Sequence, residues 1–457
     1  MNKRHDAFDA ARRQAEALET DLPEKRELVQ VERQIGSRRT RNPEEKMSPN
    51  GWISTPLGAC AKFISGGTPS KERDDYWEGD FPWVTAKDMK TLWLADTRLR
   101  LTPAGRAVAA IVPPGAILVL TRGMTLLKDL PVGISKRELS FNQDIKALIP
   151  VEGINAEFLA LQLLGRKKEI LALVDTAGHG TGRLDTEQLK QFQVNYPSQR
   201  EQRAIAETLS VWSNAIEKTD QLVINCRKQK QNFMKSLLSG HRGFGPANTR
   251  WKQPAFEEVF ERIVRKNTVG NQNVLTISGQ HGLISQREYF NKSVASENLQ
   301  GYTYLERGDF AYNKSYSAGY PVGAIKPLLA YEAGVVSSLY ICFRIKPGVE
   351  ADADFFRHYF EAGMLNDAIS GIAQEGARNH GLLNVSVKEF FKLKLRVPSI
   401  DAQRRIAEVL SAAESEERCV ERQRDKLKEE KLALMADLLT GKRRVRLTES
   451  DTAPEAA

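Results

Sequence analysis

The chain has 457 residues, of which 41% are hydrophobic and 27% charged, and it carries a formal net charge of +9. This composition excludes a wholly disordered chain, and the 15-residue uncharged run 107–121 is too short to span a membrane and contains Pro113-Pro114. The four cysteines lie at least 77 residues apart, which argues against a metal or redox motif and favours the reducing cytoplasm, whereas the positive charge suggests a polyanionic partner.

The first 51 residues differ from everything that follows them. Asp21 and Glu24 are typical of a helix start, and the polar stretch after Ile35 is typical of a linker. We therefore predict an N-terminal arm over 1–51, consisting of a helix and a flexible linker, whose residues indicate no function.

Two stretches of 44 residues repeat each other. Residues 197–240 and 398–441 align without a gap, with 14 identical positions that include Gln-Arg-x-Ile-Ala-Glu-x-Leu-Ser and a final glycine. Ser198 and Ser399 are typical helix N-caps, and Glu201 completes a capping box where the second copy has Ala402. We predict a central helical spacer over 197–240 and a C-terminal one over 398–441, each on the order of 60 Å long.

A heptad pattern runs along both predicted helices. Steps of four and three residues meet an apolar side chain at eight of ten positions in the first helix and at seven of ten in the second. This regularity favours pairing of the helices in a coiled coil over two separate amphipathic helices. The predicted helix seam comprises Ile205, Leu209, Trp212, Ile216, Val223, Phe233, Leu237, Ile406, Leu410, Val420, Leu427, Leu434 and Leu438.

The segments before the helices, 52–196 and 251–397, are matched in length and pattern. Both begin with Trp, contain Pro-Val-Gly (131–133 and 321–323), and pass through short strand-like runs to a predicted helix. We predict an α+β globule from each segment. The linker 241–250 follows the central helix, and a flexible tail over 442–457 follows the C-terminal helix.

Motifs of several enzyme classes are missing from the sequence. It has no GxxxxGK[ST] phosphate loop, no HExxH or GxSxG, and no [N/D]PP[Y/F] tetrapeptide of an amino-methyltransferase. The six histidines form no cluster with metal-ligand spacing. We therefore expect a chain that is not an enzyme and that binds no metal or cofactor.

The opening of the first globule carries a specific set of motifs. They are Leu57-Gly58, Ile64-Ser65-Gly66-Gly67-Thr68-Pro69-Ser70, Tyr76-Trp77, Pro82-Trp83-Val84 and Lys87-Asp88-Met89. With these motifs and the duplicated helix entries, residues 52–445 resemble the specificity subunits of type I restriction–modification systems. The N-terminal arm, and Ala402 where that family usually has glutamate, depart from the family pattern.

The resemblance implies both a fold and a function. The fold class would be α+β, with two globular target recognition domains (52–196 and 251–397) separated by two long antiparallel helices that form a coiled coil with a pseudo-two-fold repeat. Each domain would read one half of a bipartite, asymmetric DNA target, while the helices would set the half-site spacing and dock two modification subunits. S-adenosylmethionine, ATP and Mg would then belong to these methyltransferase subunits and to motor–nuclease restriction subunits.

Loop residues of both globules are candidates for DNA contact, because Arg, Lys, Asn and Gln read base edges and Ser, Thr and Tyr bind phosphates. In the first globule the candidates are Thr68, Ser70, Lys71, Lys87, Arg122 and Arg183. In the second globule they are Gln280, His281, Lys314, Tyr316, Arg378, Asn379 and His380.

Two other classes of function stay open from the residues alone. A self-sufficient fused methylase–nuclease would require the catalytic motifs that are missing. A coiled-coil assembly protein without DNA contact would use the helices, but would leave two globules rich in Lys, Tyr, Asn and Gln without a function.

Overall fold

The computed structural model describes residues 52–177, 180–240, 251–279, 281–290, 298–317, 319–375 and 383–446. The predicted arm over 1–51 and the linker 241–250 lie outside these ranges. The chain forms two compact units: unit 1 extends to Asp220 and resumes at Arg422, and unit 2 runs from Gln221 to Glu421. Both boundaries fall inside long helices, so each unit contains one globule and a half of each helix.

The first globule, in unit 1, is built on a five-stranded sheet with the order β2–β11–β7–β9–β4. Its strands are β2 (Ala61–Ser65), β11 (Ile145–Pro150), β7 (Ile117–Leu120), β9 (Val132–Ser135) and β4 (Trp93–Leu94). Neighbouring strands are antiparallel except for β9 and β4, which are parallel. The central strand β7 is buried at every position, which accounts for its uninterrupted apolar sequence.

Smaller sheets and short helices complete the first globule. A four-stranded sheet has the order β5–β3–β10–β6, a three-stranded sheet has the order β12–β13–β8, and β1 pairs with β14. These strands are β5 (Leu99–Leu101), β3 (Trp77–Val84), β10 (Leu139–Phe141), β6 (Ile111–Val112), β12 (Val174–Ala177), β13 (Thr181–Leu184), β8 (Arg122–Gly123), β1 (Ile53–Pro56) and β14 (Gln193–Tyr196). The helical elements are α3 (Leu57–Cys60), η1 (Asp74–Tyr76), α4 (Pro103–Val108), η2 (Met124–Leu127), α5 (Ala156–Gly165), α6 (Lys167–Leu171) and α7 (Thr186–Gln191).

The second globule, in unit 2, is built on a four-stranded antiparallel sheet with the order β15–β22–β19–β20. Its strands are β15 (Phe260–Arg262), β22 (Ile341–Ile345), β19 (Phe310–Asn313) and β20 (Ala324–Pro327). The remaining elements are β16 (Leu275–Ser278), β17 (Gly282–Ser285), β18 (Thr303–Glu306), β21 (Ala333–Val336), β23 (Gln374–Glu375), β24 (Leu383–Asn384), α9 (Phe256–Val259), α10 (Gln286–Phe290), α11 (Ala353–Glu361), α12 (Asn366–Ile372) and α13 (Val387–Lys392). Aromatic rings fill this core: Phe343 lies 4.9 Å from Phe256 and 5.5 Å from Phe310 between ring centroids.

The two main sheets are equivalent strand by strand. β2, β11, β7 and β9 of the first globule correspond to β15, β22, β19 and β20 of the second, in the same order. The strand register places Gly133 opposite Leu118 in the first globule and Lys326 opposite Ala311 in the second. The two Pro-Val-Gly tripeptides that we matched in the sequence therefore do not occupy equivalent positions.

A buried glutamine fixes the start of each long helix in the same way. Gln202 and Gln403 are 0% and 3% exposed. Gln202 Nε2 donates to the carbonyl five residues before it (3.0 Å), and its Oε1 accepts the N–H of Asn155 (2.8 Å), the N-cap of α5. Gln403 makes the same two bonds, to the carbonyl five residues before it (3.0 Å) and to the N–H of Asp352 (3.0 Å), the N-cap of α11.

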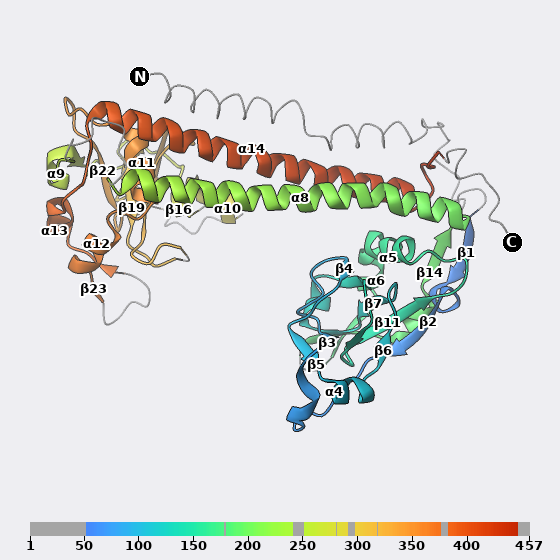
Figure 1. The fold of residues 1–457 in the computed structure, drawn as a ribbon. Coiled ribbons are helices and arrows are strands. Elements are labelled where there is room, and N and C mark those ends of the chain that lie inside the picture. The colour runs from blue at the N-terminus through green and yellow to red at the C-terminus, as the bar shows by residue number, and fades with distance from the viewer. Residues whose placement is uncertain are drawn as a thin grey trace, which may run out of the picture. The chain divides into compact units, whose positions relative to one another are not determined.

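The long helices α8 (Gln199–Leu238) and α14 (Ile400–Leu438) run antiparallel within each unit (Figure 1). In unit 1, Lys431 Nζ donates to Ser213 Oγ (2.8 Å). In unit 2, the seam carboxylate of Glu417 accepts from Arg227 Nε (2.9 Å) and also pairs with Lys230. The predicted α+β class with two long antiparallel helices is confirmed.

The predicted seam residues differ in burial along the helices. Eight of them are buried: Ile205, Leu209, Trp212, Val223, Ile406, Leu410, Leu434 and Leu438. Five are partly exposed: Ile216, Phe233, Leu237, Val420 and Leu427. Near the end of α8 the more buried side chains are the adjacent Met234 and Leu238, because this part of the helix also packs against the second globule in unit 2.

The end of the described chain packs on unit 1. Val445 is buried in a cluster with Trp212 of α8 and Leu438 of α14, and Arg444 forms an ion pair with the carboxylate of Glu201. The flexible tail predicted over 442–457 therefore does not include Arg444 and Val445, and residues 447–457 lie outside the described ranges. Among the helices of the described residues, none has both the length and the apolar character that a membrane span requires.

Replacing Gln403 with Leu tests the glutamine bond in unit 2. The substitution leaves a buried N–H and a buried carbonyl without their partner, and each such group costs about 1–3 kcal/mol. We expect the free energy of unfolding measured in urea to fall by about 2–4 kcal/mol. Gln221→Leu, at an exposed position of α8, is the matched control and should change it by less than about 0.5 kcal/mol; equal effects of the two substitutions would contradict the assignment.

A buried histidine joins α11 to α14 inside unit 2. His358 is 3% exposed, and its Nε2 lies 3.0 Å from Ser411 Oγ. The neighbouring Arg357 donates to the same hydroxyl (3.1 Å) and to the carboxylate of Glu414 (2.5 Å). Burial, followed by the charge of Arg357, lowers the pKa of His358 to about 4.

His358 should make unit 2 sensitive to acid. Its folded pKa of about 4 lies below the unfolded value near 6.5, so its contribution to stability is complete above about pH 6.5 and is lost as the pH falls toward 4. When the pH falls from 7 to 5, the free energy of unfolding measured in urea should decrease less in His358→Gln than in the wild type. The difference between the two decreases should be about 2 kcal/mol. His281→Gln, at an exposed histidine of the same unit, is the control and should follow the wild-type pH dependence.

Candidate nucleic-acid interface

A turn at residues 142–144, between β10 and β11, connects the candidate segments of the first globule. The N–H of Asn142 donates to the carbonyl of Val84 at the end of β3 (3.0 Å). The carbonyl of Asp144 accepts the N–H groups of Thr121 (2.8 Å) and Arg122 (3.2 Å). The ends of β3 and β7 are therefore held at one turn.

The loop 66–71 carries the candidates Thr68, Ser70 and Lys71 and is held at the same turn. The N–H of residue 67 donates to the last carbonyl of β10 (3.0 Å), and Thr68 Oγ1 lies 2.5 Å from Gln143 Oε1. A Cβ on Gly66 would lie 2.1 Å from the Asn142 carbonyl oxygen, so this close approach requires glycine. The three candidate side chains are exposed to solvent.

Two tryptophans support this loop through their indole nitrogens. Trp83 Nε1 donates to the carbonyl of Gly67 (3.1 Å), and Trp77 Nε1 donates to the carbonyl of Ser70 (3.0 Å). Their rings stack edge to face with centroids 5.0 Å apart. In the sequence both residues are recognisable only as parts of the family motifs. The register of β3 is irregular between Trp77 and Phe81, so strand alternation alone does not indicate that the two rings share a face.

Lys87 follows β3 in a turn that is closed by an aspartate. The Asp88 carboxylate accepts the N–H groups of Thr85 (2.9 Å) and Arg98 (3.1 Å). These bonds fix the backbone beside Lys87, whose side chain is exposed. Because β3 ends at the 142–144 turn, Lys87 belongs to the same set of loops.

Arg122 and Arg183 are directly opposite each other on the antiparallel strands β8 and β13. Directly paired residues project from the same face of a sheet, and like charges placed so are destabilising. Both side chains are exposed, and neither guanidinium group forms an ion pair with a residue that the structure describes. Such an arrangement suits a bound anion, which would relieve the repulsion between the two cations.

The candidates of the second globule lie in two loops. His281 is exposed in the turn between β16 and β17, where its N–H donates to Ser278 Oγ (3.3 Å). Lys314 and Tyr316 follow β19, and Tyr316 is 64% exposed. The other candidates, Gln280, Arg378, Asn379 and His380, lie outside the described residues.

One backbone bond shows that these loops are equivalent in the two globules. In the first, the N–H of Leu184 in β13 donates to the carbonyl of Thr121 after β7 (2.8 Å). In the second, the N–H of Leu383 in β24 donates to the carbonyl of Lys314 after β19 (3.1 Å). The segment that carries Arg122 thus corresponds to the one that carries Lys314, and β13, which carries Arg183, corresponds to β24.

Comparison with known proteins bears on the same part of the chain. Residues 49–225 match the family model of the type I restriction modification DNA specificity domain. Over these residues the chain is similar to that family. The match covers the first globule and the first part of α8, and it confirms the resemblance that the sequence motifs indicate.

Two relatives with assigned functions are specificity subunits. The type I restriction enzyme EcoR124I/EcoR124II specificity subunit of Escherichia coli is 29% identical over 188 residues, or 40% of this chain and 46% of the relative. The type I restriction enzyme MjaIX specificity subunit of Methanocaldococcus jannaschii is 30% identical over 193 residues, or 40% of this chain and 41% of the relative. The chain thus matches less than half the length of these relatives.

Solved structures extend the likeness in fold beyond the specificity domain. The S subunit of a type I restriction–modification system from M. genitalium matches 87% of this chain and 99% of its own, with a TM-score of 0.53 at 15% identity. A chain from a study of complex assembly and conformational transition of the type I R-M system matches 87% and 100%, with a TM-score of 0.54 at 13% identity. At these identities the likeness concerns the fold.

The specificity domain and the rest of the described chain show no metal centre. No group of three or more His, Cys, Asp or Glu side chains within the described ranges is arranged to hold a metal ion. The described cysteines are free thiols, and burial raises the pKa of Cys60 to about 11 and that of Cys342 to about 12. These two thiols therefore stay protonated near neutral pH and are poor nucleophiles.

Proposed function

We propose that the chain is a DNA sequence-specificity subunit of a type I restriction–modification complex. Each globule reads one half of a bipartite, asymmetric target, and α8 and α14 set the half-site spacing and dock two modification subunits. The observation that carries the proposal is the set of exposed basic loops held at the 142–144 turn, inside a segment that is similar to the DNA specificity domains.

The chemistry of the first globule's loops supports recognition of duplex DNA. The facing pair Arg122 and Arg183 suits a phosphate of the backbone, because two guanidinium groups offer bidentate donors to its oxygens. Lys71 and Lys87, from the two neighbouring loops, are positioned for further contacts with phosphates or base edges. The second globule has different side chains at the equivalent loops, which favours two unlike half-sites.

The division of labour in the proposed complex follows from the chain's own chemistry. Its sequence has no nucleotide-phosphate loop and no methyltransferase tetrapeptide. We propose that modification subunits bind S-adenosylmethionine and transfer the methyl group, and that motor–nuclease restriction subunits use ATP and Mg for cleavage. The specificity subunit then contributes binding, register and docking surfaces but no catalytic group.

Selection from a random duplex library tests the proposed function. The chain assembled with its modification subunit should enrich a motif of two defined half-sites separated by a spacer of fixed length. The assembled complex should methylate that motif, whereas the chain alone should transfer no methyl group. Enrichment of no motif would contradict the specificity role, and methyl transfer by the chain alone would favour a self-sufficient enzyme.

Replacement of Arg122 and Arg183 should lower the affinity for DNA and should also make that affinity less dependent on the salt concentration. Each phosphate contact contributes about 0.9 to the slope of log K against log salt concentration. Because the pair is proposed to bind one phosphate, the double substitution Arg122→Ala and Arg183→Ala should lower the magnitude of this slope by about 1, as measured by fluorescence anisotropy between 50 and 200 mM salt (a range of about fourfold).

The matched control for this measurement is Lys62→Ala with Lys168→Ala. Both lysines are exposed in unit 1, on β2 and α6, and their loss changes the net charge by the same amount. Neither residue belongs to the loops at the 142–144 turn, so the slope should stay near the wild-type value. Equal losses in the two double variants would show that net charge alone, and no placed contact, accounts for the effect.

A further inference from the structure

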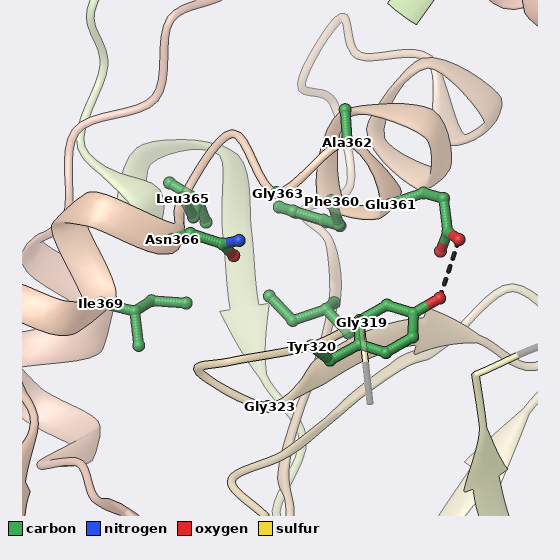
Figure 2. A pocket seen from close by; sticks show the side chains of 11 residues that line it. Gly319, Tyr320, Gly323, Phe360, Glu361, Ala362, Gly363, Leu365, Asn366 and Ile369 are labelled. Carbon is green, nitrogen blue, oxygen red and sulfur yellow. Dashed lines mark hydrogen bonds between the residues drawn. The ribbon is translucent and has the colours of Figure 1, made fainter. Parts of the chain in front are cut away.

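A nearly buried lysine lies at the centre of a polar cluster in unit 2. Lys326 on β20 is 8% exposed, and its Nζ donates to the carbonyl of Gly279 (3.0 Å) and to the hydroxyl of Tyr320 (2.9 Å). It also forms an ion pair with the carboxylate of Glu361, at the end of α11. The Tyr320 hydroxyl is 2.8 Å from Glu361 Oε1, a bond drawn in Figure 2, and 2.9 Å from the Gly279 carbonyl.

The cluster connects the two loops that carry candidate DNA contacts in this globule. Gly279 belongs to the turn between β16 and β17, which also carries His281. Tyr320 belongs to the loop between β19 and β20, which also carries Lys314 and Tyr316. The fit is close, because a Cβ on Gly279 would lie 2.8 Å from the Tyr320 ring.

Packing alone does not fix the second of these loops. A pocket of about 100 Å³ lies beside it, lined by Gly319 and Tyr320 of the loop and by Glu361 and Asn366 across from them (Figure 2). Apolar atoms therefore do not fill the space behind the loop. The hydrogen bonds of Tyr320 and the ion pair of Lys326 cross to this side of the loop, in addition to the backbone bonds between Ser317 and Tyr320 and the bond from the Tyr312 hydroxyl to the Val322 carbonyl (2.6 Å).

The fold itself does not require this cluster. The register of the equivalent sheets places Gly133 of the first globule where the second has Lys326. In the first globule, the space next to Gly133 is filled by Leu94 of β4. The ion pair is also a weak source of stability, since Lys326 is desolvated while the Glu361 side chain is 36% exposed and its attraction is screened by solvent. The best-attested value of such a pair is in specifying one arrangement.

We infer that Lys326, Glu361 and Tyr320 are positioning residues for DNA reading by the second globule. The cluster holds the turn that carries Gly279 and His281 and the loop that carries Lys314, Tyr316 and Tyr320 in one relative arrangement, so that their side chains meet the same half-site together. This inference rests on the proposed function. Burial and the nearby Glu361 carboxylate raise the pKa of Tyr320, so its hydroxyl remains a hydrogen-bond donor.

The test measures half-site selectivity of the full chain assembled with its modification subunit. Glu361→Gln removes the ion pair with little change of shape, and Tyr320→Phe removes only the hydroxyl. In selections from a random duplex library, each variant should lose about tenfold or more of the preference for the correct bases in one half-site. The preference in the other half-site should stay at the wild-type level, which a general loss of stability would not produce.

The matched control is Glu261→Gln, which removes the ion pair between Glu261 on β15 and Arg344 on β22 (2.8 Å). This pair lies on the same sheet and includes no residue of either loop, so both half-sites should keep their wild-type preference.

A second variant distinguishes a loss of selectivity from unfolding of the second globule. Replacing Lys326 and Glu361 together with Met removes both charges, and such apolar replacements are often neutral or stabilising. A variant that melts at or above the wild-type temperature, yet loses selectivity in one half-site only, supports the inference. Full selectivity in this variant and in Glu361→Gln would overturn it while leaving the proposed function intact, and a wild-type complex that enriches no bipartite motif would overturn both.

Discussion

The hydrogen bonds of one buried glutamine in each repeat are the constraint on which the rest of the structure depends. Gln202 and Gln403 each join the first turn of a long helix to the N-cap of a helix in the adjacent globule. An amide is suited to this role because it donates and accepts at the same time. The bonds fix the start of each long helix against the globule that precedes it, and the same two bonds occur in both repeats because the motif is duplicated.

On this common frame the two globules present different chemistry. The first uses a backbone-bonded turn, two tryptophans and a required glycine to hold its loops, and it places Arg122 and Arg183 opposite each other. The second uses the Lys326 cluster for the equivalent purpose. Because the strands agree in order while the loop supports differ, the frame determines where a surface lies and the loops determine what that surface binds.

The sequence predicted those parts of the fold that depend on periodicity and repetition. The long helices and their pairing follow from a heptad pattern and a gap-free repeat, and the α+β class follows from short strand-like runs that lead to a helix in both globules. The register of β20 could not be predicted, and the shared Pro-Val-Gly suggested a different one, because pairing depends on partners 11 (Asn313 and Ala324) to 17 (Phe310 and Pro327) residues away along the chain. The pairing of Arg122 with Arg183 could not be predicted either. The strands β8 and β13 that carry them are separated by nearly 60 residues, and the sequence gives no sign that the two strands are neighbours.

The position of the unit boundaries has a consequence for how such chains diversify. Unit 2 is one uninterrupted stretch of chain, Gln221 to Glu421, inserted between the two parts of unit 1. An exchange of the corresponding gene segment between relatives would transfer a complete folded body together with its own halves of both helices. The junctions would fall within continuous helix, where a seven-residue period makes two sequences easy to join in phase. The architecture thus allows recombination to replace unit 2 as a whole while the core of unit 1 stays unchanged.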